Sequence, residues 1–189
     1  MDACILFQGR LTDLLLSLAE QGAFEPIWSD EIHAEWSRNL AASKLQIPQD
    51  RIEWRKAEMQ RAFPAASCAP DPVLTHAVQA MCRTPAQCKD AHVVATAVTA
   101  KASTIVTHNI KDFAPAVIQH YRLSKVRPDG FCVDLLADGQ AEVLGGLRGH
   151  RNSLKRRPMD PAEYVAYLST PDLGLTRFCR RLLTHLGSI

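Results

Sequence analysis

The sequence lacks the features that direct a chain into or across a membrane. No run approaches the roughly 18 uninterrupted apolar residues of a membrane span. The start, Met1-Asp2-Ala3-Cys4, has neither the basic region nor the apolar core of a secretory signal. Apolar residues make up 47% of the 189 residues and charged residues 22%, which is typical of a globular protein with a real core. We therefore expect one cytoplasmic domain, or one domain with a modest appendage.

The cysteines show no metal-binding pattern. None of the six forms a C-x-x-C pair, and no paired histidine motif accompanies them, so a structural zinc site is not expected. In a reducing compartment they are most simply small buried apolar residues. The sequence also contains no internal repeat and no low-complexity tract.

The small net charge of +2 is unevenly distributed along the chain. Residues 1–120 carry 11 Lys and Arg against 13 Asp and Glu, whereas residues 121–189 carry 11 against 7. An acidic body with a basic tail suits a phosphate-rich ligand, since carboxylates hold a metal and cations hold the phosphate backbone. The asymmetry is too small to decide the function by itself.

Two adjacent segments, a predicted helix and a predicted strand, carry candidate ligand residues. Val93, Val94 and Ala97 recur at helical spacing after Asp90, which predicts a helix that opens on an acid. The β-branched run 104–106 then predicts a buried strand, with Asp112 in the loop beyond its carboxyl end. In open α/β sheets this rim is where ligands bind, so the two acids are candidates for a cation site.

Alternating helices and short strands surround these segments. Helices are predicted for residues 11–21, 30–40, 50–63, 73–81 and 115–121, strands near 26–28, 65–69 and 123–126, and a loop from Thr84 to Lys89. This alternation favours βαβ units and a parallel sheet. From Pro128 onward the pattern is helical, and it includes a capping box at Asp160 to Glu163 and a basic cluster at residues 148–157.

Four acids are candidates for the cation site: Asp2 at the first strand, Glu35 on a helix, and Asp90 and Asp112 as above. Mg²⁺ and Mn²⁺ take oxygen ligands, and gathered carboxylates repel one another until a dication is bound. Such a metal can activate a water molecule for phosphodiester hydrolysis. Each acid also has a structural interpretation, as an N-cap, a loop acid, a terminal residue or a solvated helix residue, and periodicity does not exclude it.

Each of the four acids lies in a short motif, and the motifs follow one another along the chain. They are Asp2-Ala-Cys-Ile-Leu-Phe, Trp28-Ser-Asp-Glu-Ile-His-Ala-Glu35-Trp, Lys89-Asp90-Ala-His-Val-Val-Ala, and Ile105-Val-Thr107-His-Asn109-Ile-Lys-Asp112-Phe113. This set resembles the motifs of PIN-domain ribonucleases, particularly the VapC-like toxins of bacterial toxin–antitoxin pairs. The resemblance covers about residues 1–126, and the helical tail resembles the C-terminal part of one PIN subfamily.

The resemblance implies an α/β fold, a three-layer sandwich of helices around a parallel sheet of about five strands, with an acidic Mg²⁺ or Mn²⁺ site at one rim. It divides the chain into a nuclease domain (residues 1–127) and a C-terminal helical extension packed on it (residues 128–189). The implied metal ligands are Asp2, Glu35, Asp90 and Asp112. It further implies that Thr107 and Asn109 orient the reacting water or Asp112, whereas a metal mechanism needs neither His92 nor His108.

The implied activity is metal-dependent cleavage of RNA by a toxin that a separate antitoxin protein neutralises, and the family also allows a homodimer. A second hypothesis is a degenerate PIN module that binds RNA or a protein without cleavage, because only Met1 precedes Asp2 where the family has a central strand. In that case the basic cluster at residues 148–157 would bind RNA in a salt-sensitive way. A third, a small-molecule phosphohydrolase, would be recognised by nucleotide turnover.

Overall fold

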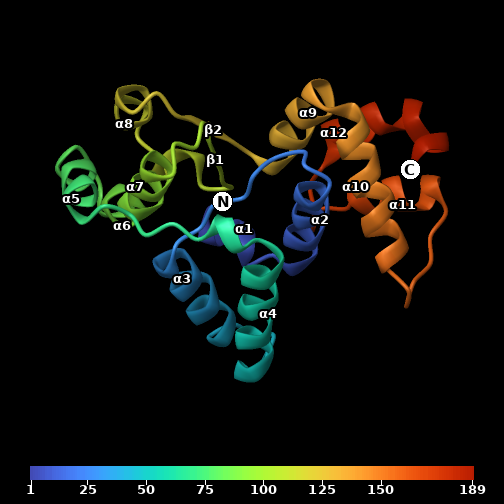
Figure 1. Cartoon of the computed structure of the whole chain (residues 1–189), viewed down its shortest axis with the longest axis horizontal. Coiled ribbons are helices and arrows are strands. Elements are labelled where there is room, and N and C mark those ends of the chain that lie inside the picture. The colour runs from blue at the N-terminus through green and yellow to red at the C-terminus, as the bar shows by residue number, and fades with distance from the viewer. The chain divides into compact units, whose positions relative to one another are not determined.

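The structure is a computed structural model that describes every residue from 1 to 189. Its contacts divide the chain into two compact units (Figure 1). The N-terminal unit contains residues 1–7 and 26–126, and the C-terminal unit contains residues 8–25 and 127–189. Residues 8–25, which the sequence-based division places in the first domain, therefore belong by contact to the C-terminal unit.

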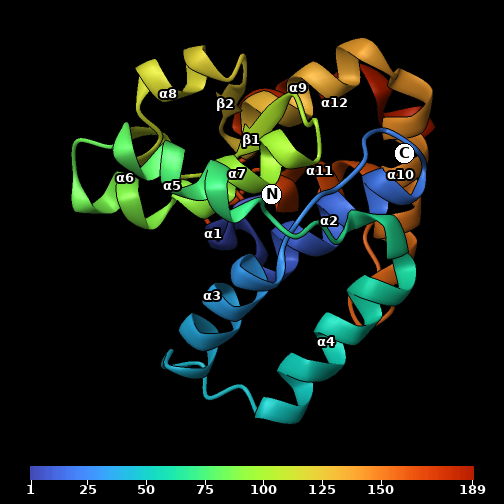
Figure 2. The same cartoon turned by 60° about the vertical axis from the view of Figure 1, so that its left-hand side comes forward.

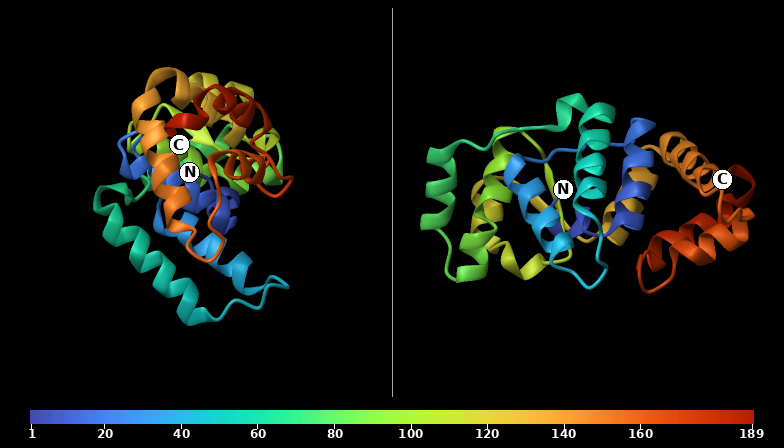
Figure 3. Two further views of the ribbon diagram at one scale, coloured as in Figure 1. Left: turned by 90° about the vertical axis from the view of Figure 1, so that its right-hand side faces the viewer. Right: turned by 90° about the horizontal axis from the view of Figure 1, so that it is seen from below.

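The N-terminal unit contains seven α-helices and both strands of the chain. Helices α3 and α4 lie side by side and are joined by a short connection (Figure 2), and α5 packs along α7 (Figure 3). The helices are α1 (Ala3–Leu6), α3 (Asp30–Ala41), α4 (Gln49–Ala62), α5 (Pro72–Ala80), α6 (Pro85–Lys89), α7 (Ala91–Thr99) and α8 (Pro115–His120).

Local capping explains where several of these helices begin. The hydroxyl oxygen of Ser29 accepts the N–H of Ile32, so the predicted N-cap of α3 is confirmed. Thr84 caps α6 in the same way by accepting the N–H of Gln87 at 3.2 Å. The prediction of a loop between Thr84 and Lys89 was therefore wrong, because a threonine cap followed by Pro85 at the first turn starts a helix.

Strands β1 (Thr104–Val106) and β2 (Ser124–Val126) form a parallel two-stranded sheet. Thr104 pairs with Ser124 and Val106 with Val126, and α8 makes the crossover between them. Ile105 and Val106 are buried, which is why this short β-branched run is a strand, as the sequence predicts.

The first two residues of the chain extend the hydrogen bonding beyond β1. The backbone N–H of Asp2 donates to the carbonyl of Val106 at 3.1 Å, and the amino group of Met1 donates to the carbonyl of Ile27 at 2.7 Å. Residues 1–2 are thus bonded to β1 on one side and to the segment before α3 on the other.

One further parallel bridge joins Trp28 to Ser67. Five segments are therefore linked by backbone hydrogen bonds, but only two are long enough to be strands, and the expected sheet of about five strands is not confirmed. The physical reason is local. Residues 3–6 enter α1 immediately after Asp2, Ser29 caps α3 directly after Trp28, and the 3₁₀ turn η1 (Pro64–Ala66) precedes Ser67, so none of these segments can lengthen.

The C-terminal unit is entirely helical, as the sequence predicts for residues after Pro128. Helix α2 packs closely against α10, and α9 packs against α12. The close approach requires Gly146, since a Cβ there would lie 2.7 Å from the carbonyl oxygen of Ser17. The helices are α2 (Gly9–Glu20), α9 (Pro128–Asp138), α10 (Gln140–Ser153), α11 (Pro161–Leu168) and α12 (Thr176–Leu182), followed by the 3₁₀ turn η3 (Leu183–Ser188).

The predicted capping box of α11 is confirmed. The carboxylate of Asp160 accepts the N–H of Glu163 at 2.8 Å, and the carboxylate of Glu163 accepts the N–H of Asp160 at 3.0 Å. None of the helices in either unit combines the length and the apolar character that a membrane crossing requires.

Candidate active site

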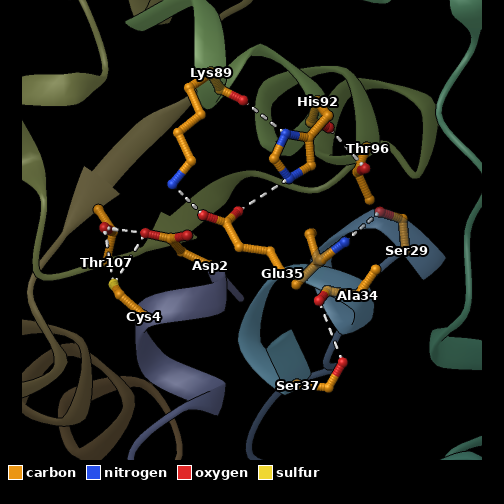
Figure 4. Close-up of polar contacts among 11 residues, drawn as sticks. Asp2, Cys4, Ser29, Ala34, Glu35, Ser37, Lys89, His92, Thr96 and Thr107 are labelled. Atoms are coloured by element: carbon orange, nitrogen blue, oxygen red, sulfur yellow. Dashed lines mark hydrogen bonds and ion pairs between the residues drawn. The ribbon is translucent and has the colours of Figure 1, made fainter. Parts of the chain in front are cut away.

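Asp2 lies at the start of α1 and not at the end of a strand. Its side chain is 3% exposed, and its Oδ2 accepts hydrogen bonds from the hydroxyl of Thr107 at 2.5 Å and from the thiol of Cys4 at 3.0 Å. Thr107 directly follows β1, so this hydrogen bond joins Asp2 to the last motif, whereas the resemblance implied that Thr107 orients the reacting water or Asp112. Two donors on one oxygen fix the carboxylate and leave Oδ1 for another contact (Figure 4).

Thr107 and Asn109 contribute to the site in different ways. Thr107 is fully buried, and its hydroxyl makes two hydrogen bonds. It accepts one from the backbone N–H of Asn109 at 2.9 Å and donates the other to Asp2. Asn109 is exposed, and this contact uses its main chain. Thr107 thus orients Asp2, and Asn109 orients Thr107.

Cys4 also belongs to this cluster, although the cysteines were expected to be small buried apolar residues. Burial, followed by the charge of Asp2, raises the pKa of the Cys4 thiol to about 12. The group therefore stays protonated at neutral pH and serves as a donor to Asp2, not as a nucleophile. The only signal in the sequence was its position two residues after a candidate ligand.

Glu35 lies on the buried face of α3 beside the fully buried Trp36, whereas Glu31 on the same helix is exposed. The side chain of Glu35 extends from α3 toward the start of α7 (Figure 4). Its Oε1 accepts a hydrogen bond from the ammonium of Lys89 at 2.5 Å, and its Oε2 lies 3.6 Å from Nε2 of His92. Glu35 is therefore bound by Lys89 at the end of α6 and lies near His92 of α7, whose Nε2 makes no hydrogen bond.

Lys89 and His92 were not predicted as site residues. The hydrogen bond to Glu35 raises the pKa of the Lys89 ammonium, and the side chain of Lys89 remains 62% exposed. Nδ1 of His92 lies 2.9 Å from the carbonyl oxygen of Lys89, which fixes the ring against the end of α6. The signal available in the sequence was the spacing of these residues on either side of Asp90.

Asp90 lies at the junction of α6 and α7 and is 7% exposed. Its side chain makes no capping hydrogen bond to α7, so a helix-capping role does not explain its position. Burial, together with the negative charges of Asp2, Glu35 and Asp112, raises the pKa of the Asp90 carboxyl to about 7, against the opposing charge of Lys89. All three of the other candidate acids therefore act electrostatically on this one carboxyl.

Asp112 ends the 3₁₀ turn η2 (Ile110–Asp112) and is half-buried. The ammonium of Lys125 on β2 holds this turn by donating to the carbonyl of Ile110 at 2.8 Å and to the carbonyl of Phe113. This role of Lys125 could not be predicted from the sequence, because nothing in a short strand pattern shows which loop its side chain reaches.

The chemistry of the four carboxylates fits a hard divalent cation, which prefers oxygen ligands. Their mutual repulsion at Asp90 is the electrostatic condition that such a cation relieves. In this structure, however, no three carboxylate, imidazole or thiolate side chains are gathered around a common point as metal ligands. The ammonium of Lys89 supplies the positive charge next to Glu35 instead.

Comparison with family models matches residues 1–111 to the PIN domain and residues 128–184 to the VapC50 C-terminal domain. The first match covers more than half of the chain and includes every candidate site residue except Asp112, which lies one residue beyond its end. No curated protein and no solved structure matches the chain.

Proposed function

The chain belongs to the PIN-domain family and carries a VapC50 C-terminal domain, and on this premise we propose that it is a Mg²⁺- or Mn²⁺-dependent endoribonuclease. Its two domains are those of a VapC-like nuclease toxin in general. The proposal adds the metal, the RNA substrate, a location in the cytoplasm and a separate antitoxin protein that neutralises the toxin. It also retains the division into a nuclease domain (residues 1–127) and a helical extension (residues 128–189).

The observation that carries the proposal is the environment of Asp90. An isolated aspartate on the protein surface would keep its ordinary pKa, but this carboxyl is buried and repelled by three other acids, which raises its pKa to about 7. Burying mutually repelling carboxylates destabilises a fold, and strongly shifted pKa values of this kind are typical of functional sites, so we infer that a cation binds here. Asp2, Glu35, Asp90 and Asp112 are the residues that would hold it.

The chain's own side chains then have distinct roles. A divalent cation, when bound, supplies Lewis-acid polarisation of a phosphate and lowers the pKa of a water molecule. The hydroxyl of Thr107 donates its hydrogen bond to Oδ2 of Asp2, so Oδ1 is the oxygen that would serve as a ligand. Lys89, whose side chain is mostly exposed, would be able to donate a charge-assisted hydrogen bond to a phosphate oxygen of the RNA.

Cleavage of a labelled RNA by the purified full chain tests the proposal. With Mg²⁺ or Mn²⁺ present, Asp90→Asn should lower the cleavage rate by about 100-fold or more, because the central ligand loses its charge. Asp134→Asn is the matched control, since this exposed acid lies on α9 of the C-terminal unit, and it should leave the rate unchanged. Metal-dependent cleavage that survives Asp90→Asn would overturn the assignment.

One observation favours the second candidate, a PIN module that binds RNA or a protein without cutting. Glu35 is already paired with Lys89, and the acids are not gathered as a ligand set in this structure. Such a module would show no carboxylate-dependent binding of Mn²⁺ but would retain RNA binding. Lys89→Met separates the two candidates, because freeing Glu35 should preserve or strengthen Mn²⁺ binding only if the acids are ligands.

A further inference from the structure

A cavity of about 450 Å³ lies within the C-terminal unit, outside the acidic site. It is bounded by the first turn of α2, the segment after α10 and one face of α11. Four of its eight lining residues are basic and none is acidic; the basic ones are Arg10, Lys155, Arg156 and Arg157. Its size is within the range of about 300–1,000 Å³ that is usual for ligand pockets.

The cavity combines these cations with a flat aromatic surface. Tyr167 lies half-buried in its wall and stacks on the buried ring of Tyr164, with ring centroids 6.4 Å apart. The charges of Arg10 and Arg157 act on the Tyr167 hydroxyl, and those of Asp13 and Asp172 oppose them, so two cations and two acids lie near this ring. Leu154 and Met159 add apolar surface beside them.

The basic side chains are free to meet a ligand. Arg156, Arg157 and Lys155 are exposed in the turn after α10, where backbone hydrogen bonds fix the main chain. Arg10 forms an ion pair with Asp172 at 3.6 Å, and both of these side chains are largely exposed. An ion pair of that kind is weak in water and exchanges readily for a phosphate.

A second cavity of about 370 Å³ shares Arg157, Met159 and Tyr167 with the first. Two adjoining cavities around one ring suit successive units of a polymer better than a single small anion. Glu163, the only acid on the second cavity, already accepts the N–H of Asp160 in the capping box. The arrangement of cations around an aromatic face is the one that single-stranded nucleic acids use.

We propose that this basic pocket binds single-stranded RNA, with phosphates on Arg156 and Arg157 and a base stacked on Tyr167. The pocket would be a second RNA contact, separate from the four acids, and it rests on the proposed function only in that RNA is the ligand. Neither the PIN-domain match nor the acidic cluster includes these residues, apart from Arg10.

The test uses the full chain carrying Asp90→Asn, without divalent metal, so that RNA is bound and not cleaved. Fluorescence anisotropy with a labelled single-stranded RNA of mixed sequence should show a loss of affinity of about tenfold for Arg156→Ala combined with Arg157→Ala. The slope of log affinity against log salt should also fall by about 1.4, since each phosphate contact on a single strand contributes about 0.7. Tyr167→Leu should lower the affinity by about fivefold or more with an unchanged slope.

Arg180→Ala combined with Arg181→Ala is the matched control, because it removes the same charge from exposed residues of α12 outside the pocket. Its affinity should stay within twofold of the parent. An equal loss in the control, or no loss in the pocket variants, would overturn the pocket. So would competition by an acidic polypeptide as effective as that by RNA, since the ligand would then be a protein.

These outcomes are independent of catalysis. If the chain with the native Asp90 cleaves no RNA while the pocket variants still weaken RNA binding, the nuclease proposal fails and the pocket stands. If cleavage depends on Asp90 but binding ignores Arg156 and Arg157, the pocket fails and the nuclease proposal stands.

Discussion

The two units bury very different kinds of side chain. Eight of the buried polar or charged residues belong to the N-terminal unit, and three of them are the acids Asp2, Glu35 and Asp90. The C-terminal unit buries only two, Thr12 and His150, and carries its charges on the surface. Buried acids destabilise a fold unless they are paired or bind a cation, so the buried acids mark a site in the N-terminal unit, whereas the charged groups of the C-terminal unit are solvated.

The difference also separates two ways of holding a fold together. In the N-terminal unit, side-chain hydrogen bonds such as Thr107 to Asp2 and Lys125 to Ile110 join segments far apart in the sequence. In the C-terminal unit, tight helix packing around Gly146 is added to such bonds, one of which runs from the N–H of Phe178 to the carboxylate of Asp129. Substitutions in the two units should therefore fail for different physical reasons.

The largest expected effect is that of Gly146→Ala. The added Cβ would lie 2.7 Å from the carbonyl oxygen of Ser17 and 2.8 Å from the Cα of Leu18, and backbone atoms cannot move away cheaply. We expect the free energy of unfolding to fall by about 3 kcal/mol, measured by chemical denaturation. Gly149→Ala is the control on the same helix, because nothing lies within 4 Å of its Cβ position. It should raise the stability by about 0.5–1 kcal/mol, and a similar loss in both variants would contradict the packing account.

Acid should weaken both units through one buried histidine each. Burial lowers the pKa of His33 and of His150 from 6.5 to about 4, with a further contribution from Lys56 at His33. Each histidine therefore binds a proton more strongly in the unfolded chain than in the folded one. The free energy of unfolding is then highest above pH 6.5 and falls as the pH is lowered toward 4. We expect a loss of about 2 kcal/mol for each histidine over this window.

Unfolding measured over a series of pH values checks this prediction. Replacing either histidine by glutamine should remove its share of the pH dependence, and the two effects should add because the residues lie in different units. Variants with the pH dependence of the parent chain would show that these imidazoles do not change charge on unfolding.

A smaller effect is expected from Lys125→Met. The substitution removes the ammonium that binds the carbonyls of Ile110 and Phe113, so the turn carrying Asp112 loses its anchor. Stability should fall by about 1–2 kcal/mol, and RNA cleavage by about tenfold through misplacement of a ligand. Lys111→Met removes an exposed ammonium from the same turn and should change neither quantity by much. Equal effects would mean that local charge, and not anchoring, is what matters.

Local patterns in the sequence were sufficient for much of the fold. The apolar spacing of α7, the β-branched run of β1 and the caps at Ser29 and Asp160 each depend on a few neighbouring residues, and each is confirmed. Helix α1 is only four residues long, too short for a periodicity to show, and its position after Asp2 is one reason the expected first strand is absent.

Long-range contacts could not be predicted in this way. An apolar stripe does not name its partner, so nothing in residues 9–20 showed that α2 packs on α10. The contact of Lys89 with Glu35 spans 54 positions, and no local pattern encodes it. The rim position predicts Asp90 and Asp112 as ligands, and the ordered motifs of the PIN family add Asp2 and Glu35, but neither indicates the contacts of Cys4, Lys89, His92 and Lys125.

A calorimetric titration of the metal-free full chain with Mn²⁺ tests most directly whether the buried acids form one cation site. We expect saturable binding of Mn²⁺ to the parent chain. Asp90→Asn should weaken this binding by at least tenfold, and Asp134→Asn should leave it unchanged. Binding of equal affinity in all three chains, or no binding to the parent chain, would contradict it.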